Sequence, residues 1–355
     1  MALPVSTQLR YWGIGFAIFI LLLYVLGNVL LPFITGMAIA YFLDPTADKL
    51  EAWGLKRVWA TIIITLVSLL IALPLFIVLI RELVIQLSAL FEAAPQILSD
   101  LQGFLISTFP ALLDETSTLR GIIDSFFDAI QASSGTIANY VLTSAFSVVD
   151  ALVFMIVAPV VAFYMLMDWD RMIAAIDSWL PRDHKDTIRG LARELDRTMA
   201  GFIRGQLSVC AILGAFYAIA LMLVGLQFGL IVGIIAGLLT FIPYVGALIG
   251  GALSVGLALF QFWQTPEWVV VVVLIFAIGQ TIEGNFLTPK LVGGSVGLHP
   301  VWLLFALSAF GSLFGFTGML VAVPVAACIG VFTRFGLGQY LGGKLYRGAA
   351  EGDDG

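Results

Sequence analysis

The fold of this chain is decided by an uncharged apolar stretch near its N-terminus, YWGIGFAIFILLLYVLGNVLL, at residues 11–31. About 20 apolar residues in a helix cross the hydrocarbon core of a bilayer, so this stretch is long enough to span one. It is also longer than the apolar core of a secretory signal, which is about 7–15 residues, and this favours a retained helix over a cleaved leader. The stretch therefore predicts a membrane protein.

The composition supports the same interpretation. Of the 355 residues, 61% are hydrophobic and 11% are charged, and the mean hydropathy is +1.05. A soluble domain carries about 25% charged residues, so this chain has more apolar surface than a water-exposed fold can hide. Cys210 and Cys328 lie inside apolar runs. We expect them to pack as small apolar residues rather than to form a disulfide or a metal site.

Further apolar runs of membrane-spanning length follow along the chain. Residues 11–43 predict a helical hairpin with a short second arm, because Asn28, Pro32 and Gly36 interrupt the run. The other predicted crossings are residues 58–80, 148–167, 202–225, 230–260, 268–287 and 301–332. The sequence thus predicts an all-α polytopic membrane protein with about eight transmembrane helices, some of them re-entrant or broken by proline or glycine.

The polar segments divide the chain into regions. In residues 81–147 apolar side chains recur at helical spacing, which predicts extracytoplasmic amphipathic helices broken at Pro110. Residues 168–204 predict basic helices at the cytoplasmic interface that lead directly into the next crossing. The remaining expected regions are a hairpin with the third crossing at 1–80, the fourth crossing at 148–167, a C-terminal bundle with broken helices at 205–335 and a cytoplasmic tail at 336–355.

The orientation follows from the lysines and arginines of short loops, which favour the cytoplasmic side. They gather in residues 44–57, 168–204 and 334–347, whereas Arg120 alone occurs in residues 82–150. With eight crossings the basic segments share one side. This predicts that both termini lie in the cytoplasm.

Two apolar runs near the C-terminus contain helix breakers. Proline removes a backbone donor, and open backbone at membrane depth survives only beside protein or a water-filled cavity. A pair of broken helices therefore points to a substrate pathway, with a kinked and tightly packed helix as the alternative. The predicted break or gating positions are Pro243, Gly246, Pro289, Gly315, Gly318 and Pro324.

Polar residues concentrate in GQTIEGNFLTPKLVGGSVGLHP, residues 279–300. Gln280 and Glu283 lie one turn apart, so we expect them to share a helix face. A carboxylate close to the end of an apolar run is a functional candidate, with a glutamate that reaches interfacial water as the alternative. The predicted transport or coupling residues are Glu283, Gln280, Asn285 and Tyr244, and the possible charge partners are Lys290, His299 and Arg204.

The sequence gives only one weak match to an enzyme motif. GGSVG at residues 293–297 matches the G-x-S-x-G pattern of serine hydrolases, but that motif needs a strand before it and a helix after it, and no strand is predicted there. The chain has no HExxH, Walker or GxGxxG motif, so a metalloprotease and an ATP-driven pump are not indicated. We expect a protein that is not an enzyme and uses no cofactor or metal.

Four stretches resemble signatures of the autoinducer-2 exporter family of bacterial inner-membrane permeases. They are LPFITGMAIAYFLDP, FIPYVGALIG, GQTIEGNFLTPKLVG with GLHPVWLLFALSAFG, and LFGFTGMLVAVPVAA, and the resemblance extends over nearly the whole chain. It implies a multi-helix, homo-oligomeric permease that works without ATP. Members of the family have been assigned either export of the furanone signal autoinducer-2 or exchange of sodium or lithium for protons.

Three functions remain open from the sequence. Export of a small polar solute needs hydrogen-bonding groups in an apolar passage, which Gln280, Asn285 and Tyr244 would supply. Na⁺(Li⁺)/H⁺ antiport needs an ionisable coupling group, and Glu283 is the candidate. A non-transporting membrane scaffold would use the amphipathic insert to bind partners. The expected partners are the lipid bilayer, a small polar solute or a monovalent cation with a proton, and further copies of the chain, but no nucleic acid.

Overall fold

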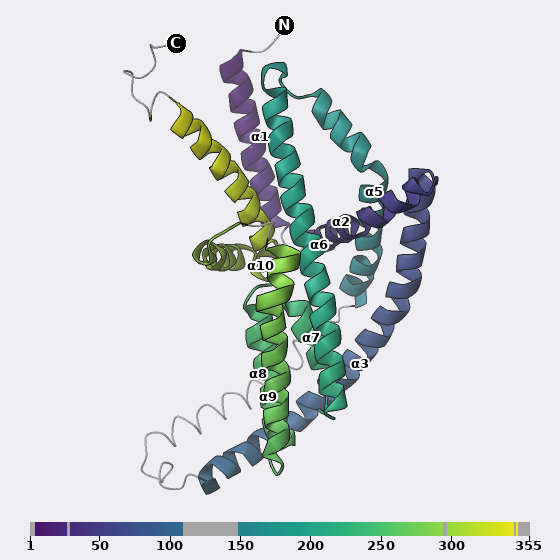
Figure 1. The fold of residues 1–355 in the computed structure, drawn as a ribbon, viewed down its shortest axis with the longest axis vertical. Coiled ribbons are helices and arrows are strands. Elements are labelled where there is room, and N and C mark those ends of the chain that lie inside the picture. The colour runs from purple at the N-terminus through teal and green to yellow at the C-terminus, as the bar shows by residue number, and fades with distance from the viewer. Residues whose placement is uncertain (1–3, 27–28, 109–147, 294–296, 344–345, 347–355) are drawn as a thin grey trace. The chain divides into compact units, whose positions relative to one another are not determined.

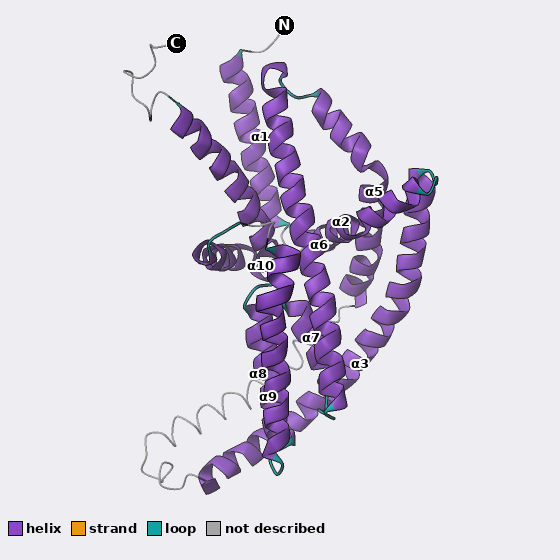
Figure 2. Cartoon of the chain, viewed as in Figure 1, coloured by secondary structure: helices purple, strands orange, loops and turns teal. Residues whose placement is uncertain are grey.

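The computed structural model describes residues 4–26, 29–108, 148–293, 297–343 and 346. Within these ranges every regular element is a helix and no strand occurs (Figures 1 and 2). The chain forms two compact units. Unit 1 comprises Met1–Thr65, Phe154–Val209 and Glu283–Gly355, and unit 2 comprises Leu66–Val153 and Cys210–Ile282.

The prediction of an all-α polytopic membrane protein is confirmed. Six of the described helical segments are long and apolar enough to cross a membrane, and two shorter apolar helices accompany them. The long ones lie in α2 (Leu30–Ala52), α3 (Arg57–Thr108), α5 (Val148–Ser178), α6 (Lys185–Leu223), α9 (Pro266–Ile282) with the π-helix η2 (Glu283–Val292), and α10 (Pro300–Gly342). The shorter two are α7 (Gly229–Leu239) and α8 (Val245–Gln261).

The N-terminal run does divide into two helices, α1 (Val5–Val25) and α2. The predicted short second arm is wrong, because α2 continues as far as Ala52 through the polar residues that follow the apolar run. Pro32 lies in the first turn of α2, where a missing N–H breaks no helical hydrogen bond. The helix then passes Pro45 in its interior, and the carbonyl that this proline frees finds a partner described below.

The third crossing is part of a much longer helix than the sequence indicated. α3 runs without interruption over 52 residues, so residues 81–108 of the expected insert extend the crossing rather than form a separate helix. The rest of the insert, including the predicted break at Pro110, lies outside the described residues. In α6 the basic segment and the apolar segment join in one continuous helix of 39 residues, which follows the short 3₁₀ helix η1 (Arg182–His184).

In unit 1, α2, α3 and α5 pack through small side chains. A buried cluster consists of Ala40, Ala47, Ile64, Ala162 and Leu166. A Cβ at Gly36 would lie 2.6 Å from the carbonyl oxygen of Ala158 in α5, so only glycine allows this approach of the two backbones. Small residues that let helices meet closely are typical of membrane-protein interfaces.

In unit 2, residues 230–260 form a helical hairpin instead of one kinked crossing. The chain reverses at residues 240–244 between α7 and α8, so Ala236 meets Gly250, with 2.6 Å between the alanine Cβ and a Cβ built at the glycine. Thr240 likewise lies against Gly246, where a Cβ would overlap the threonine backbone. In a continuous helix the first pair would be roughly 21 Å apart along the axis and the second roughly 9 Å apart. Figure 1 shows α7 and α8 beside one another.

A Gln261 side chain closes the base of this hairpin. At the end of α8, its Oε1 accepts a hydrogen bond from the Gln227 amide at 2.6 Å, and its Nε2 donates to the Gly225 carbonyl at 2.8 Å. The chain therefore enters α7 and leaves α8 at the same level. α7 has 11 residues and is roughly 16 Å long, and α8 has 17 residues and is roughly 25 Å long, so both arms are shorter than a 30 Å hydrocarbon core.

Unit 1 contains a second sharp break, in α10. Gly315 has φ 60° and ψ −139°, a backbone conformation that residues other than glycine rarely adopt. The two halves of α10 fold together, since Ala306 from the first half shares a buried cluster with Ala322 and Ala326 from the second. The break expected ahead of Pro324 is thus at Gly315, and Pro324 itself is buried inside the second half of the helix.

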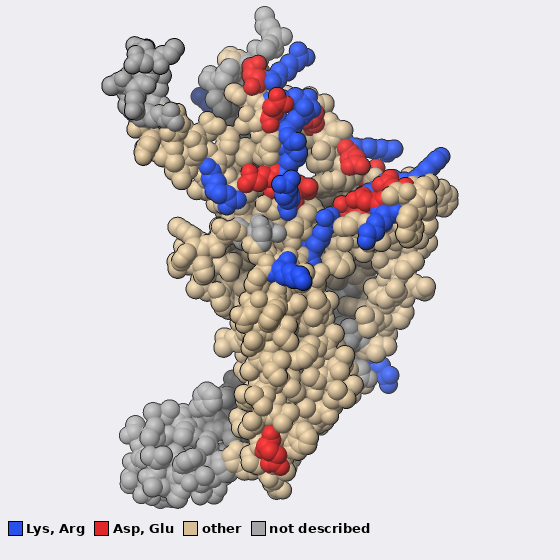
Figure 3. Space-filling view, viewed as in Figure 1, with Lys and Arg blue, Asp and Glu red and all other residues tan. Residues whose placement is uncertain are grey.

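The surface of the protein matches a lipid environment. Leu70, Leu223 and Leu248 each expose about three quarters of their area. In the face shown in Figure 3 most of the charged side chains gather in one region, and wide areas elsewhere carry little charge. Such a surface would aggregate in water and is stable against hydrocarbon.

A glycine pair in unit 2 provides a test of this close packing. Gly237 of α7 faces Gly214 of α6, and a Cβ at Gly237 would overlap the Cα of Gly214. Gly256 of α8 has no atom within 4 Å of such a Cβ. We expect Gly237→Ala to lower the midpoint of thermal unfolding in detergent. Gly256→Ala should leave it unchanged or raise it, because alanine is better than glycine in a helix by up to about 1 kcal/mol. Equal midpoints for the two variants would contradict the α6–α7 contact.

Candidate functional site

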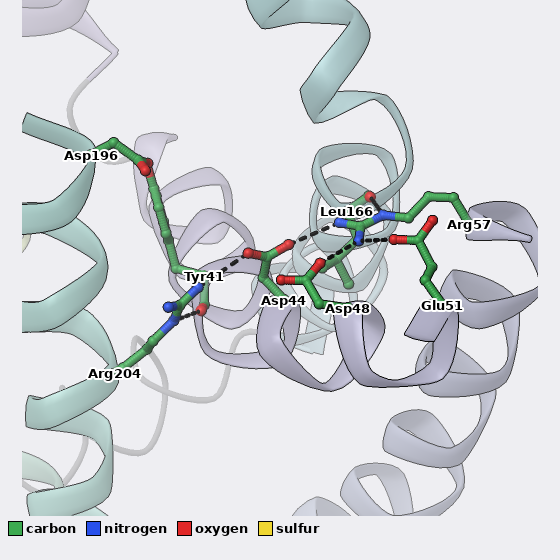
Figure 4. A network of polar contacts seen from close by, with 8 residues as sticks. All are labelled: Tyr41, Asp44, Asp48, Glu51, Arg57, Leu166, Asp196 and Arg204. Atoms are coloured by element: carbon green, nitrogen blue, oxygen red, sulfur yellow. Dashed lines mark hydrogen bonds and ion pairs between the residues drawn. The ribbon is translucent and has the colours of Figure 1, made fainter. Parts of the chain in front are cut away.

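A network of charged side chains ties the end of α2 to its neighbours in unit 1 (Figure 4). Asp44, Asp48 and Glu51 follow one another at intervals of four and three residues, which places them on one face of α2. Arg57, at the start of α3, reaches all three carboxylates at 2.8, 2.8 and 2.9 Å. Its Nε also donates to the Leu166 carbonyl of α5 at 2.9 Å. One guanidinium therefore joins three helices.

A second guanidinium satisfies a backbone carbonyl that a proline leaves free. Pro45 has no N–H, so the Tyr41 carbonyl one turn earlier lacks its helical donor. Arg204 of α6 donates to this oxygen from Nε at 2.6 Å, and its terminal nitrogen lies 3.1 Å from Asp44 Oδ2. Asp44 thus holds Arg204 on one oxygen and Arg57 on the other. The proline in the LDP sequence is what makes room for this contact between α2 and α6.

A cavity of about 290 Å³ opens beside the network in unit 1. The Tyr41 hydroxyl donates to Asp196 Oδ1 at 3.1 Å across it, and the Tyr41 ring meets Trp169 edge to face with 5.7 Å between the centroids. The lining residues come from α2, α5 and α6, and they are Met37, Ala40, Tyr41, Asp44, Asp48, Met165, Leu166, Trp169, Asp196, Arg197, Ala200 and Arg204. The cavity therefore combines carboxylates, guanidiniums and aromatic rings.

Sequence reasoning missed this network apart from Arg204. The signal was present, because Asp44, Asp48 and Glu51 repeat at helical spacing just ahead of Arg57. Residues 44–57 were predicted to be a loop, so their charges were used only to infer the orientation in the membrane. The described residues hold no group of three or more His, Cys, Asp or Glu side chains arranged for a metal ion.

Of the predicted polar residues, Gln280 has a clear partner in unit 2. Its Nε2 donates to the hydroxyl of Tyr217 on α6 at 3.2 Å. The ring of Tyr217 is buried and stacks on Phe276 with 5.0 Å between centroids, and its hydroxyl is 3.4 Å from the Phe276 carbonyl. Gly279 packs directly against the Tyr217 ring. An amide and a phenol therefore meet among apolar helices.

Glu283 and Asn285 lie at the start of a π-helix that the sequence did not indicate. The regular α-helical spacing ends at Ile282, and η2 carries a wider i to i+5 bond from the Gly293 amide to the Thr288 carbonyl at 2.8 Å. Glu283 is half-buried, while Asn285, Pro289 and Lys290 are exposed. π-Helices are rare and often occur at functional sites. Gln280 belongs to unit 2 and Glu283 to unit 1. That the two side chains lie on one helix face therefore stays a prediction.

The other predicted residues have local roles at helix ends and turns. His299 caps α10, where its Nδ1 accepts from the Val301 amide at 3.3 Å. Tyr244 ends the α7–α8 turn with φ 67° and is 54% exposed, and Pro243 lies in the same turn. Gly318 is buried against the Phe310 carbonyl, on the opposite side of the Gly315 break.

The Arg57 contacts predict a specific loss of stability. Arg57→Met would remove a donor whose own side chain is only 18% exposed, and would leave the Leu166 carbonyl and the three α2 carboxylates without it. We expect a cost of roughly 2–3 kcal/mol and a lower midpoint of thermal unfolding in detergent. Arg57→Lys should recover only part of the lost stability, since the lysine ammonium cannot reproduce the planar, forked donor arrangement of the guanidinium.

The matched control is Arg171→Met. Its side chain is 87% exposed and lies 3.4 Å from Asp168 in an i,i+3 pair, so its loss should change the midpoint little. If Arg57→Met and Arg171→Met shift the midpoint equally, the network does not hold unit 1 together.

Comparison with known proteins agrees with this architecture. The family model described as "AI-2E family transporter" matches residues 14–338. The chain is 30% identical to the "Putative transport protein YrrI" of Bacillus subtilis (strain 168), over 86% of both chains. It is also 30% identical to the "Putative permease PerM" of Escherichia coli (strain K12), over 87% of both chains. With nearly its whole length matched by one model, and with the helices and breaks described above inside that match, this chain belongs to the AI-2E family of transporters.

Proposed function

We propose that the chain is a permease that exports a small, neutral, hydroxyl-rich solute of the autoinducer-2 class across the bacterial inner membrane, driven by a gradient and not by ATP. The observation that carries this proposal is the α7–α8 hairpin of unit 2, whose first arm of 11 residues is too short to cross and whose base is closed by Gln261. Backbone that reverses within a bilayer needs protein or a water-filled cavity around it. Membership of a transporter family supports a water-filled cavity at this place.

The polar groups beside the hairpin suit a neutral solute. The Tyr217 hydroxyl and the Gln280 amide can each donate and accept hydrogen bonds, so they can exchange their mutual bond for bonds to solute hydroxyls. Thr240, at the tip of the hairpin, is buried and donates to the Ala236 carbonyl of its own helix at 2.8 Å. None of these groups carries a charge, which favours a neutral solute over an ion at this place.

Gln280→Leu tests the assignment of this polar pair. The change keeps a similar volume but removes the amide, and we expect export of autoinducer-2 from proteoliposomes to fall about fivefold to tenfold, because one hydrogen bond contributes roughly 1–1.5 kcal/mol. Tyr217→Phe should have a similar effect. The matched control is Gln264→Leu, since Gln264 is exposed in the turn before α9, and it should export at the unaltered rate.

The same vesicles distinguish the alternatives. Sodium-dependent proton flux that Glu283→Gln abolishes would establish Na⁺(Li⁺)/H⁺ antiport with Glu283 as the coupling carboxylate. Absence of both fluxes for the unaltered protein would favour a non-transporting scaffold. Export that persists in Gln280→Leu at the control rate would remove the polar pair from the transport path.

The proposed orientation places both termini in the cytoplasm, and oligomerisation with further copies is part of the same proposal. Basic residues in η1 and the first half of α6 support this side assignment. In a variant without Cys210 and Cys328, Asp183→Cys should react with a membrane-impermeant maleimide in inside-out vesicles and not in intact cells. Labelling in intact cells would reverse the orientation.

A further inference from the structure

The cavity of unit 1 has the size and shape of a site for one small ligand. Its volume of about 290 Å³ is at the lower end of small-molecule sites, which are roughly 300–1,000 Å³. All its lining residues belong to α2, α5 and α6 of the same unit, so the site is complete within it. The permease function proposed above relies on residues of unit 2 and gives this cavity no role.

The charges around the cavity leave an excess of carboxylate. Arg57 is shared among three acids, and Asp44 is shared between Arg57 and Arg204. Arg197 adds one further positive charge to the lining, while Asp196 adds a negative charge and accepts a hydrogen bond from the neutral Tyr41 hydroxyl. In total the carboxylates of Asp44, Asp48, Glu51 and Asp196 exceed the guanidiniums of Arg57, Arg197 and Arg204 by one. A cation would neutralise that excess.

Of the two guanidiniums that line the cavity, that of Arg204 is already engaged by α2. Arg204 is held by Asp44 and by the Tyr41 carbonyl, both from α2. Arg197, Asp196 and Asp48 are exposed side chains, so water screens their charges to a similar degree. An anion at Arg204 would compete with a contact that supports the α2 backbone, whereas a cation at Asp196 would leave that contact in place.

The apolar part of the lining suits alkyl groups on that cation. Tyr41 and Trp169 meet edge to face. In this arrangement one ring points its edge at the other, so the partner covers neither face of the first ring. Met37 and Met165 add adaptable thioether side chains to the same lining. Aromatic faces beside carboxylates are the usual recognition elements for quaternary ammonium groups.

We propose that the cavity between α2, α5 and α6 is a binding site for a small organic ammonium ion, with Trp169 and Tyr41 facing its alkyl groups and Asp196 and Asp48 its charge. Binding of an ammonium ion to this cavity does not require the proposed permease function, because it is measured without transport. An autoinducer-2 export defect would leave it untouched, and a failure of binding would leave the export proposal untouched.

The test uses the full-length protein in detergent and isothermal titration with three probes of nearly equal shape. Choline is the cation, 3,3-dimethylbutan-1-ol is its neutral carbon analogue, and 3,3-dimethylbutanoate is an anion of similar bulk. We expect choline to bind saturably, at least about tenfold more tightly than the neutral analogue, and the affinity to fall as salt is added.

Two variants and two matched controls locate the site. Asp196→Asn keeps an oxygen that accepts from Tyr41 but removes the charge, and it should weaken choline binding about tenfold or more. Trp169→Leu should weaken it to a similar extent. Asp170→Asn and Trp179→Leu alter exposed side chains of the same types outside the lining, and they should bind choline as the unaltered protein does. The unfolding midpoint of each variant is measured first, so Asp196→Asn remains informative if Trp169→Leu fails to fold.

Three outcomes would overturn the proposal. Equal affinity for choline and 3,3-dimethylbutan-1-ol would make the cavity a merely apolar site. Tighter binding of 3,3-dimethylbutanoate, strengthened further by Asp196→Asn, would assign the cavity to anions through Arg197 and Arg204. No saturable choline binding, or unchanged binding in both Asp196→Asn and Trp169→Leu, would show that the cavity does not recognise ammonium ions.

Discussion

The structure depends on a demand that burial makes of every peptide group, namely that a carbonyl without a helical donor must receive one from elsewhere in the protein or from water. Pro45 creates such a carbonyl on Tyr41, and Arg204 satisfies it from a different helix. Asp44 then neutralises Arg204 and, on its other oxygen, Arg57. Pro45 of α2 thereby gives Arg204 of α6 a backbone acceptor beside the charged network. The aromatic cavity lies directly against that network.

The two units meet the same demand in different ways. Unit 1 uses charge to hold helices that contain a proline, and the cost of desolvating its ions is offset by several short hydrogen bonds for each guanidinium. Unit 2 uses close contact, since Gly233 and Gly237 of α7 let its backbone meet that of α6 without any side chain between them. Its polar pair, Tyr217 and Gln280, is uncharged. The difference suits a neutral solute near unit 2 and a charged ligand in unit 1.

Apolar runs and basic loops were sufficient to predict a helical membrane protein and the approximate place of most of its long helices, because hydrocarbon imposes one length and one secondary structure on any crossing segment. The same runs could not distinguish a kink from a reversal. Whether Pro243 bends a helix or ends one depends on Gly246 and Gly250 accepting the backbone of α7, a contact between segments. Pro324 stays helical while Gly315 breaks α10, since φ at Gly315 is set by packing between the two halves. The carboxylates of α2 were misjudged because their helix extends past its apolar part.

Gln261 also has a consequence for biosynthesis. Its side chain supplies the donor and the acceptor that bind the Gly225 carbonyl and the Gln227 amide, yet it leaves the ribosome only after α7 and α8 have been made. Until then the nascent chain cannot close the base of the hairpin, because neither hydrogen bond of the Gln261 side chain has formed. The two ends of the hairpin are therefore joined only once the last residue of α8 has been translated.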